Sequence, residues 1–283
     1  MHTFHTPVEG KVGLLTGGTS GFGYEMVQAL LQQGANLAVF SVDELSDADL
    51  AKIRKIDTGN VEFYTQDIMA AGASQKMVDQ TVERFGKLDF VIVNAGFALR
   101  VEESLLNVSL DKLAEDMRTQ FEVFPIAFAT LALAAARVIA PRYAAVAPDP
   151  DTEHRPDSGA IVVTLSETSL CPLRDDMLAY GAAKRACLAI MQSLAATLGP
   201  QNIRVNGIAP GFANTARPRQ FYSRHPQIKA DIDAKAHLKP AFMHPGAVVP
   251  AVLYLLTDNY VTGEVIALDG GYNIQLNRYF QDT

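Results

Sequence analysis

Residues Val12 to Gln33 read V-G-L-L-T-G-G-T-S-G-F-G-Y-E-M-V-Q-A-L-L-Q-Q, and this segment sets the class of fold. Its apolar start, Val12–Thr16, predicts a short strand, and Tyr24–Gln33, closed by Gly34, predicts a helix with apolar pairs four residues apart. Between them lies a loop with four glycines. Glycine permits tight turns and a close approach of the backbone, and a helix N-terminus presents free N–H groups to a phosphate. The segment therefore predicts a phosphate-binding loop, with a plain turn as the alternative.

The alternation of strand and helix continues along the chain. Further strands are predicted at Leu37–Ser41, Val61–Gln66, Leu88–Asn94, Ala160–Leu165, Ile203–Ile208 and Glu264–Leu268. Helices are predicted at Ala73–Phe85, at Ser109–Ile139 with a bend near Pro125, and at Met177–Leu198. Near-continuous apolar strands that alternate with helices indicate a parallel sheet covered on both faces. We therefore predict an α/β fold in one domain, residues 1–283, with a doubly wound (Rossmann) parallel sheet of about seven strands.

Composition excludes several classes of protein. Apolar residues make up 48% of the chain and charged residues 19%, so a large core is expected. The net charge of −7 makes the chain a poor binder of nucleic acid. Two cysteines and six scattered histidines predict neither a disulfide framework nor a metal site. The longest apolar run, Val123–Ala136, is shorter than the roughly 20 residues of a membrane span, so we expect a core or interface helix, no membrane contact and a cytoplasmic protein.

Two side chains of the predicted helix at 177–198 carry acid–base chemistry. Tyr180 and Lys184 are four residues apart and project from one helix face. A phenol has a pKa near 10, and a neighbouring ammonium is expected to lower that pKa toward neutrality. Ser166, at the carboxyl end of its strand, would hydrogen-bond a substrate oxygen. Because this spacing is common by chance, a structural tyrosine is the alternative.

With these motifs in order, the chain resembles the short-chain dehydrogenase/reductase family over nearly its full length. The matching segments are Thr16-Gly17-x-x-x-Gly21-x-Gly23, Asp67-Ile68, Asn94-Ala95-Gly96, Tyr180-x-x-x-Lys184, Pro210-Gly211-Phe212 with Thr215, Thr262-Gly263 and Asp269-Gly270-Gly271. The resemblance implies that a nicotinamide cofactor is bound by Gly17, Thr19, Ser20, Gly21, Phe22, Gly23, Ser41, Asp43, Asp67, Ile68, Asn94, Ala95, Gly96, Tyr180, Lys184, Pro210, Gly211, Phe212 and Thr215.

The resemblance also implies catalytic roles. Tyr180 would be the general acid or base, Lys184 would lower its pKa and bind the nicotinamide ribose, and Ser166 would orient the substrate oxygen. Counting back from Tyr180 by the family's usual spacing reaches Glu167 instead, but the strand register favours Ser166, with Thr168 and Ser169 as fallbacks. Gln120 stands where the family has an asparagine of a proton relay, and the alternative is that Gln120 faces solvent.

The segment after the second strand bears on the cofactor. Residues 40–44 read F-S-V-D-E, with no basic residue before Lys52, which favours NAD over NADP. The family's acidic position aligns with Ser41, and Asp43 follows two residues later, where a plain loop carboxylate is the alternative. We predict an NAD(P)-dependent alcohol dehydrogenase or ketoreductase (EC 1.1.1.-) acting on a small organic substrate. A dinucleotide-binding protein with a non-redox or regulatory role is the alternative. The resemblance implies a homotetramer or homodimer.

Two surface segments complete the expectations. A loop insertion is predicted near 147–158, and a substrate lid near 213–240 is implied by the resemblance. Four arginines in the lid and in nearby loops could bind a substrate carboxylate or phosphate: Arg100, Arg174, Arg217 and Arg219. The alternative is that they lie on a solvated helix face. An apolar pocket could equally be lined by Phe97, Leu99, Phe212, Phe221 and Tyr222.

Overall fold

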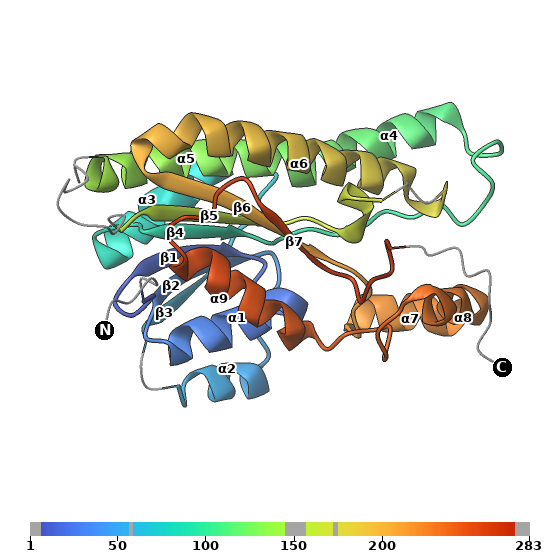
Figure 1. Ribbon diagram of the computed structural model, residues 1–283, viewed down its shortest axis with the longest axis horizontal. Helices are drawn as coiled ribbons and strands as arrows, with labels where there is room; N and C mark the ends of the chain where they lie inside the picture. Colours follow the sequence, from blue (N-terminus) through green and yellow to red (C-terminus); the bar gives the residue numbers. More distant parts are fainter. Residues whose placement is uncertain (1–6, 57–58, 145–156, 172–174, 275–283) are drawn as a thin grey trace.

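The apolar segments of the sequence build one central sheet. The computed structural model describes residues 7–56, 59–144, 157–171 and 175–274. Seven parallel strands pair in the order β3-β2-β1-β4-β5-β6-β7 (Figure 1). They are β1 Val12–Thr16, β2 Asn36–Ser41, β3 Val61–Thr65, β4 Phe90–Val93, β5 Gly159–Thr164, β6 Ile203–Pro210 and β7 Val265–Leu268. Strands β2 and β3 are added on one side of β1, and β4 to β7 are added on the other side. The strand order therefore switches between β1 and β4, and ligands are expected beyond the carboxyl ends of these two strands. The predicted doubly wound sheet is confirmed.

Helices cover both faces of the sheet. One face carries α1 (Gly21–Gln32), α2 (Asp47–Ile53) and α9 (Val249–Thr257), and the other carries α3 (Ala73–Phe85), α4 (Leu110–Phe121), α5 (Ala127–Tyr143) and α6 (Leu178–Leu198) (Figure 1). Each face has its own apolar core. Two further helices, α7 (Ala216–Arg224) and α8 (Pro226–Lys235), stand apart from both layers and share a smaller core.

A π-helical turn at Glu122–Ile126 joins α4 to α5 in one long helical rod. Pro125 lies within this turn. A proline has no N–H for the helical hydrogen bonds and its ring crowds the preceding turn, which accounts for the departure from a regular α-helix. The π-helical turn lies where a bend was predicted, and the bend itself stays a prediction. By length and composition, Leu110–Tyr143 could cross a membrane, but 61% of its apolar window is buried inside the protein. Packing against the sheet and α3 accounts for this apolar character without a bilayer.

Some elements differ from the sequence predictions. The first helix begins at Gly21 rather than Tyr24, so its N-terminus lies inside the glycine loop. Neither α2 nor α9 was predicted. Helix α2 buries only Ile53 and so has almost no apolar stripe. Helix α9 is apolar nearly throughout, so its sequence shows no helical period. The predicted insertion near 147–158 lies largely outside the described residues.

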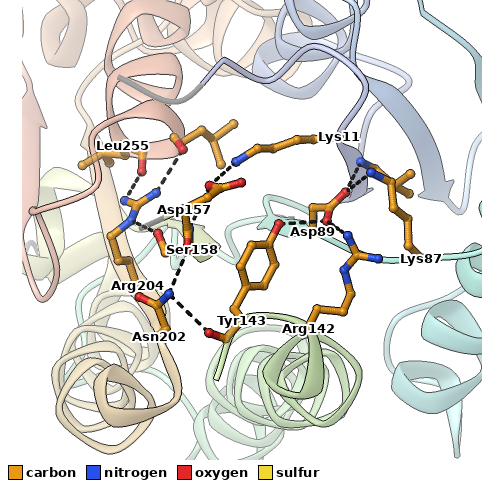
Figure 2. Close-up of polar contacts among 12 residues, drawn as sticks. Lys11, Lys87, Asp89, Arg142, Tyr143, Asp157, Ser158, Asn202, Arg204 and Leu255 are labelled. Atoms are coloured by element: carbon orange, nitrogen blue, oxygen red, sulfur yellow. Dashed lines mark hydrogen bonds and ion pairs between the residues drawn. The ribbon is translucent and has the colours of Figure 1, made fainter. Parts of the chain in front are cut away.

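A buried polar network holds the amino-terminal edge of the sheet, opposite the edge where ligands are expected (Figure 2). The Asp89 carboxylate accepts hydrogen bonds from the Val12 N–H (2.8 Å) and the Tyr143 hydroxyl (2.9 Å), and pairs with Lys87 and Arg142 at 3.0 Å each. Burial raises the pKa of Asp89, but its donors outweigh burial and hold the pKa below its ordinary value. In the same network, the buried Arg204 guanidinium donates to the carbonyls of Leu255 (2.6 Å) and Leu256 (3.0 Å), which close α9.

Candidate active site

The glycine loop takes a form that only glycine allows at two key positions. Gly17 has φ of 71° and Gly21 has φ of 54°, both in the left-handed region. A Cβ on Gly23 would lie 2.0 Å from the Gly17 carbonyl oxygen, so this turn of α1 packs directly on the loop. Ser20 is the N-cap residue of α1, and its side chain makes no capping hydrogen bond. The first amides of α1 therefore form a cradle of the kind that binds phosphate.

Asn94 ties the carboxyl ends of three strands together. Its backbone N–H donates to the Thr16 hydroxyl oxygen (3.0 Å), and its side-chain amide donates to the Gly17 carbonyl (3.0 Å). The Thr164 hydroxyl donates to its amide oxygen (3.1 Å). The Ala95 N–H also donates to Thr16 (3.1 Å). Asn94 and Ala95, predicted to bind the cofactor, thus hold the glycine loop in place beside β4 and β5.

The end of β2 carries hydroxyls rather than charges. The Ser41 and Thr19 hydroxyl oxygens lie 2.8 Å apart, which joins β2 to the glycine loop. Asp43 is exposed. Lys52, on α2, pairs with Asp49 at 2.7 Å. Asp67 is exposed at the end of β3 and accepts a hydrogen bond from the Met69 N–H (2.9 Å), which shapes the adjoining turn.

Ile68 and the segment after β6 complete the predicted cofactor residues. Ile68 packs against the core of its sheet face. Gly211 lies against Asp269, since a Cβ there would come within 2.8 Å of the Asp269 Cα. Thr215 caps α7, and its methyl lies 3.5 Å from the Cβ position of Gly21. The structure therefore brings the segment at 210–215 up to the glycine loop, although the two are far apart in sequence.

Lys184 is buried beneath the site rather than exposed in it. Only 4% of its surface is exposed, and its ammonium donates to the Thr164 carbonyl at 2.7 Å. The same nitrogen lies 3.8 Å from the centre of the Phe124 ring, a cation–π contact, and 5.8 Å from the centre of the Tyr180 ring. Burial lowers the pKa of Lys184 to about 8. Phe124 was not predicted as a site residue.

The expectation that the pKa of Tyr180 lies below its ordinary value is wrong in this structure. Burial around the hydroxyl raises the pKa of Tyr180, and the Glu167 carboxylate raises it further. The Ser166 hydroxyl and the Arg100 guanidinium act in the opposite direction, and the groups that shift this pKa most do not include Lys184. The reason is geometric, because the ammonium faces the Thr164 carbonyl and the Phe124 ring. Phe124 also meets the Tyr180 ring edge to face, with 5.4 Å between ring centres.

Ser166 lies two residues beyond the end of β5, at the carboxyl edge where the strand register placed it, and is 4% exposed. Its hydroxyl donates to the Glu167 carboxylate (Oγ–Oε2 2.7 Å) and accepts the Thr168 N–H at 3.3 Å. Glu167 is itself 6% exposed and begins a short 3₁₀ turn, Glu167–Ser169. The spacing from Tyr180 had pointed to Glu167 as an alternative to Ser166, and the structure brings both residues to the site. Sequence reasoning gave no role to the carboxylate.

Gln120 is fully buried, so the alternative that it faces solvent is wrong. Its amide nitrogen donates to the Phe97 carbonyl (3.1 Å), and its amide oxygen accepts the Leu99 N–H (3.3 Å). The side chain therefore holds the loop that follows β4. A role of Gln120 in a proton relay stays a prediction.

The lid segment at 213–240 forms α7 and α8 over an aromatic cluster. The Phe212 ring meets Tyr272 with 4.9 Å between centres, and Tyr222 meets Phe242 at 5.0 Å. Phe212, Phe221 and Tyr222 thus build the lid core. Arg100 reaches this cluster from the loop after β4, with its guanidinium carbon 4.2 Å from the centre of the Phe221 ring.

The arginines near the lid divide into two groups. Arg100 forms an ion pair with Asp176 at 2.6 Å. Arg217 and Arg219 are exposed, which favours the solvated-face alternative for both. Arg174 lies outside the described residues.

Comparison with known proteins agrees with this arrangement. A family model described as enoyl-(acyl carrier protein) reductase matches residues 17–273. The chain is 30% identical over 276 residues to secoisolariciresinol dehydrogenase of Forsythia intermedia, covering 94% of this chain and 90% of that protein. The crystal structure of an NADPH-dependent 3-quinuclidinone reductase from Rhodotorula rubra aligns with a TM-score of 0.80 and 23% identity, over 95% of this chain and 93% of that one. A 7α-hydroxysteroid dehydrogenase complexed with NADH and 7-oxo glycochenodeoxycholic acid aligns with a TM-score of 0.81 and 21% identity, over 98% and 100%.

The chain belongs to the short-chain dehydrogenase/reductase family. It is an oxidoreductase of that family, whose members bind nicotinamide cofactors, NAD or NADP.

Proposed function

We propose that this protein transfers a hydride between a nicotinamide cofactor and a small organic alcohol or ketone, with Tyr180 as general acid or base. The observation that carries this proposal is the meeting of Tyr180, Ser166 and Lys184 at the carboxyl edge of the sheet. The Ser166 hydroxyl is close enough to Tyr180 to affect its pKa, and the Lys184 ammonium lies beneath the Tyr180 ring. Fold alone would not support this function, but these side chains do.

The residues present fit a dinucleotide. The glycine loop and the first amides of α1 would hold the pyrophosphate, since a Cβ on Gly17 or Gly23 would collide with neighbouring backbone there. Thr215 lies against the same loop and would close the site from the other side. When bound, the nicotinamide supplies or accepts the hydride. The protein contributes the positions of the reacting groups and a proton at the Tyr180 oxygen.

The raised pKa of Tyr180 keeps the phenol in the protonated form that the acid role needs, but it also makes the phenol a weaker acid. A phenol that stays protonated at neutral pH can donate its proton to a carbonyl oxygen during reduction. For the reverse reaction the phenol must lose that proton, and the Arg100 guanidinium favours the phenolate. The Lys184 ammonium, near in space, would add to this once the site closes around its ligands.

We propose NAD as the cofactor in preference to NADP. The Ser41 and Thr19 hydroxyls occupy the carboxyl end of β2, and Lys52, the first basic residue after that strand, is paired with Asp49. Values of KM for NADH and NADPH, measured with one substrate, test this. We expect the lower KM with NADH, and a clear preference for NADPH would refute the assignment.

The protein is further proposed to self-associate as a homodimer or homotetramer along α5. Ile126, in the π turn before α5, is 45% exposed, Leu133 on α5 is 43% exposed, and Met69 beside them is 40% exposed. These three side chains line one groove between α5 and the loop after β3. Light scattering of the purified protein tests this, because Leu133→Arg should reduce the measured mass. A wild-type monomer would refute it. The cytoplasmic location stays a prediction.

A substrate screen tests the proposed activity. NADH oxidation is followed with a panel of ketones and NAD reduction with the matching secondary alcohols, with Tyr180→Phe as control. We expect turnover of at least one pair by the wild type and a loss of at least 100-fold in the variant. Cofactor binding without turnover of any pair would favour the non-redox alternative.

A further inference from the structure

The hydrogen-bonding capacity of Ser166 is almost fully used by the protein itself. A serine hydroxyl has one hydrogen to donate and two lone pairs to accept with. The hydrogen is given to the Glu167 carboxylate at 2.7 Å, and the negative charge of that carboxylate also raises the pKa of Tyr180. One lone pair receives the Thr168 N–H at 3.3 Å. A single lone pair remains, and it faces the Tyr180 hydroxyl, which hydrogen-bonds Ser166 here and which a substrate oxygen would displace from it.

The turn that carries Glu167 holds this arrangement. The Glu167 carbonyl accepts the N–H groups of Leu170 (2.9 Å) and Cys171 (3.1 Å). Asn273, from the end of the described chain, also donates to it at 3.4 Å. These bonds hold the backbone of Glu167 beside Ser166. Because Ser166 and Glu167 are 4% and 6% exposed, water competes little for the bond between their side chains.

From this arrangement we propose that Glu167 is a positioning residue: it takes the hydrogen of Ser166, so that the site binds the alcohol of a substrate pair more tightly than the ketone. The inference rests on the proposed function, in which the substrate oxygen lies between Tyr180 and Ser166. An alcohol there accepts a hydrogen bond from Tyr180 and donates its own hydrogen to Ser166. A ketone oxygen accepts from Tyr180 but meets only a lone pair on Ser166.

The size of the preference follows from the bond that a ketone would have to break. For Ser166 to donate to a ketone oxygen, its hydrogen must leave the Glu167 carboxylate. Hydrogen bonds to charged groups are the stronger ones, and the loss of one weakens binding by about tenfold to a hundredfold. We therefore expect the wild type to bind an alcohol at least tenfold more tightly than the matching ketone.

Dead-end complexes test the inference without turnover. Calorimetry gives Kd for cyclohexanol with NADH present and for cyclohexanone with NAD present, and the same is done for the pair that the screen finds best. Glu167→Leu removes the acceptor and frees the Ser166 hydrogen, so the ketone should bind about tenfold more tightly and the two Kd values should approach each other. Glu167→Gln keeps the shape of the side chain but not its charge and should fall between the wild type and the leucine variant. Exposed Glu122, changed to Gln, is the matched control and should keep the wild-type ratio.

The outcomes separate the two proposals. A wild type that turns over a pair but shows a Kd ratio unchanged by both Glu167 variants, or tighter binding of the ketone, overturns this inference and leaves the proposed function intact. A wild type that binds nicotinamide but turns over nothing overturns the proposed function, and this inference with it. Independently of activity, a crystal structure with more than 3.5 Å between Ser166 Oγ and both Glu167 carboxylate oxygens would overturn it.

Discussion

Removal of the Phe124 ring should change the protonation of Lys184. The ammonium lies 3.8 Å from the ring centre and is 4% exposed, so solvent does little to weaken this cation–π contact. Such a contact contributes about 2 kcal/mol when it is desolvated. Phe124→Leu keeps an apolar side chain but loses the π face, and ~2 kcal/mol corresponds to a more than tenfold change in a protonation equilibrium.

The direction of the change follows from the pKa of Lys184. Burial has already lowered that pKa to about 8, and loss of the ring lowers it further, so the lysine becomes mostly neutral near pH 7. The assay is the pH dependence of kcat/KM for ketone reduction. In the wild type, kcat/KM should fall as pH rises through about 8, and in Phe124→Leu the fall should occur at lower pH, with kcat/KM at pH 7 reduced roughly fourfold.

The matched control for Phe124→Leu is Phe128→Leu. Phe128 lies on the same rod, is 1% exposed and belongs to the same apolar core. It should lose stability without a change in the pH profile. The reasoning is refuted if both variants keep the alkaline fall of the wild type, or if both shift it equally.

Three further changes test other parts of the structure. Gly23→Ala places a Cβ 2.0 Å from the Gly17 carbonyl oxygen and should weaken NADH binding, measured by calorimetry, at least tenfold. Gly199→Ala, with open space around it, is the control and should leave the Kd for NADH unchanged. Equal Kd values for the two variants would contradict the phosphate-binding cradle at the glycine loop. Ser166→Ala should lower kcat/KM for alcohol oxidation at least tenfold, and near-normal turnover of the alcohol would move its role elsewhere. Asp89→Asn should cost about 3 kcal/mol in urea unfolding at pH 7. Because the folded pKa of Asp89 is depressed, its contribution to stability is present above the unfolded pKa and is lost as pH falls through the folded pKa. The difference in unfolding free energy between wild type and Asp89→Asn should therefore shrink in acid. A difference that stays constant with pH would argue against this account.

The order of the motifs along the chain and the side-chain periodicity were enough to predict most of the fold. The strand bounds came within a few residues because a strand buried on both faces is continuously apolar, as in β4 and β5. Helices α2, α7, α8 and α9 were not predicted. Of these, α2 and α9 lack an amphipathic stripe, so periodicity could not reveal them.

The catalytic pair was equally accessible to local reasoning, but its electrostatics were not. Tyr180 and Lys184 share a helix face because of their spacing. The pKa of each depends on burial and on neighbours such as Glu167, and Lys184 turns its ammonium toward Thr164. No spacing rule contains that information, so the expected direction for Tyr180 was wrong.

The sequence by itself determined the strand–loop–helix start, the parallel sheet and the family, because glycine conformation, apolar period and helical spacing act between near neighbours in the chain. Only the tertiary structure decided that the Phe124 ring lies against Lys184, that Gln120 faces inward and that Glu167 takes the hydrogen of Ser166. The first two join residues distant in the sequence, and the third depends on how a buried turn orients two side chains. Packing across elements sets such contacts, and with them the charge and hydrogen-bond direction at the site.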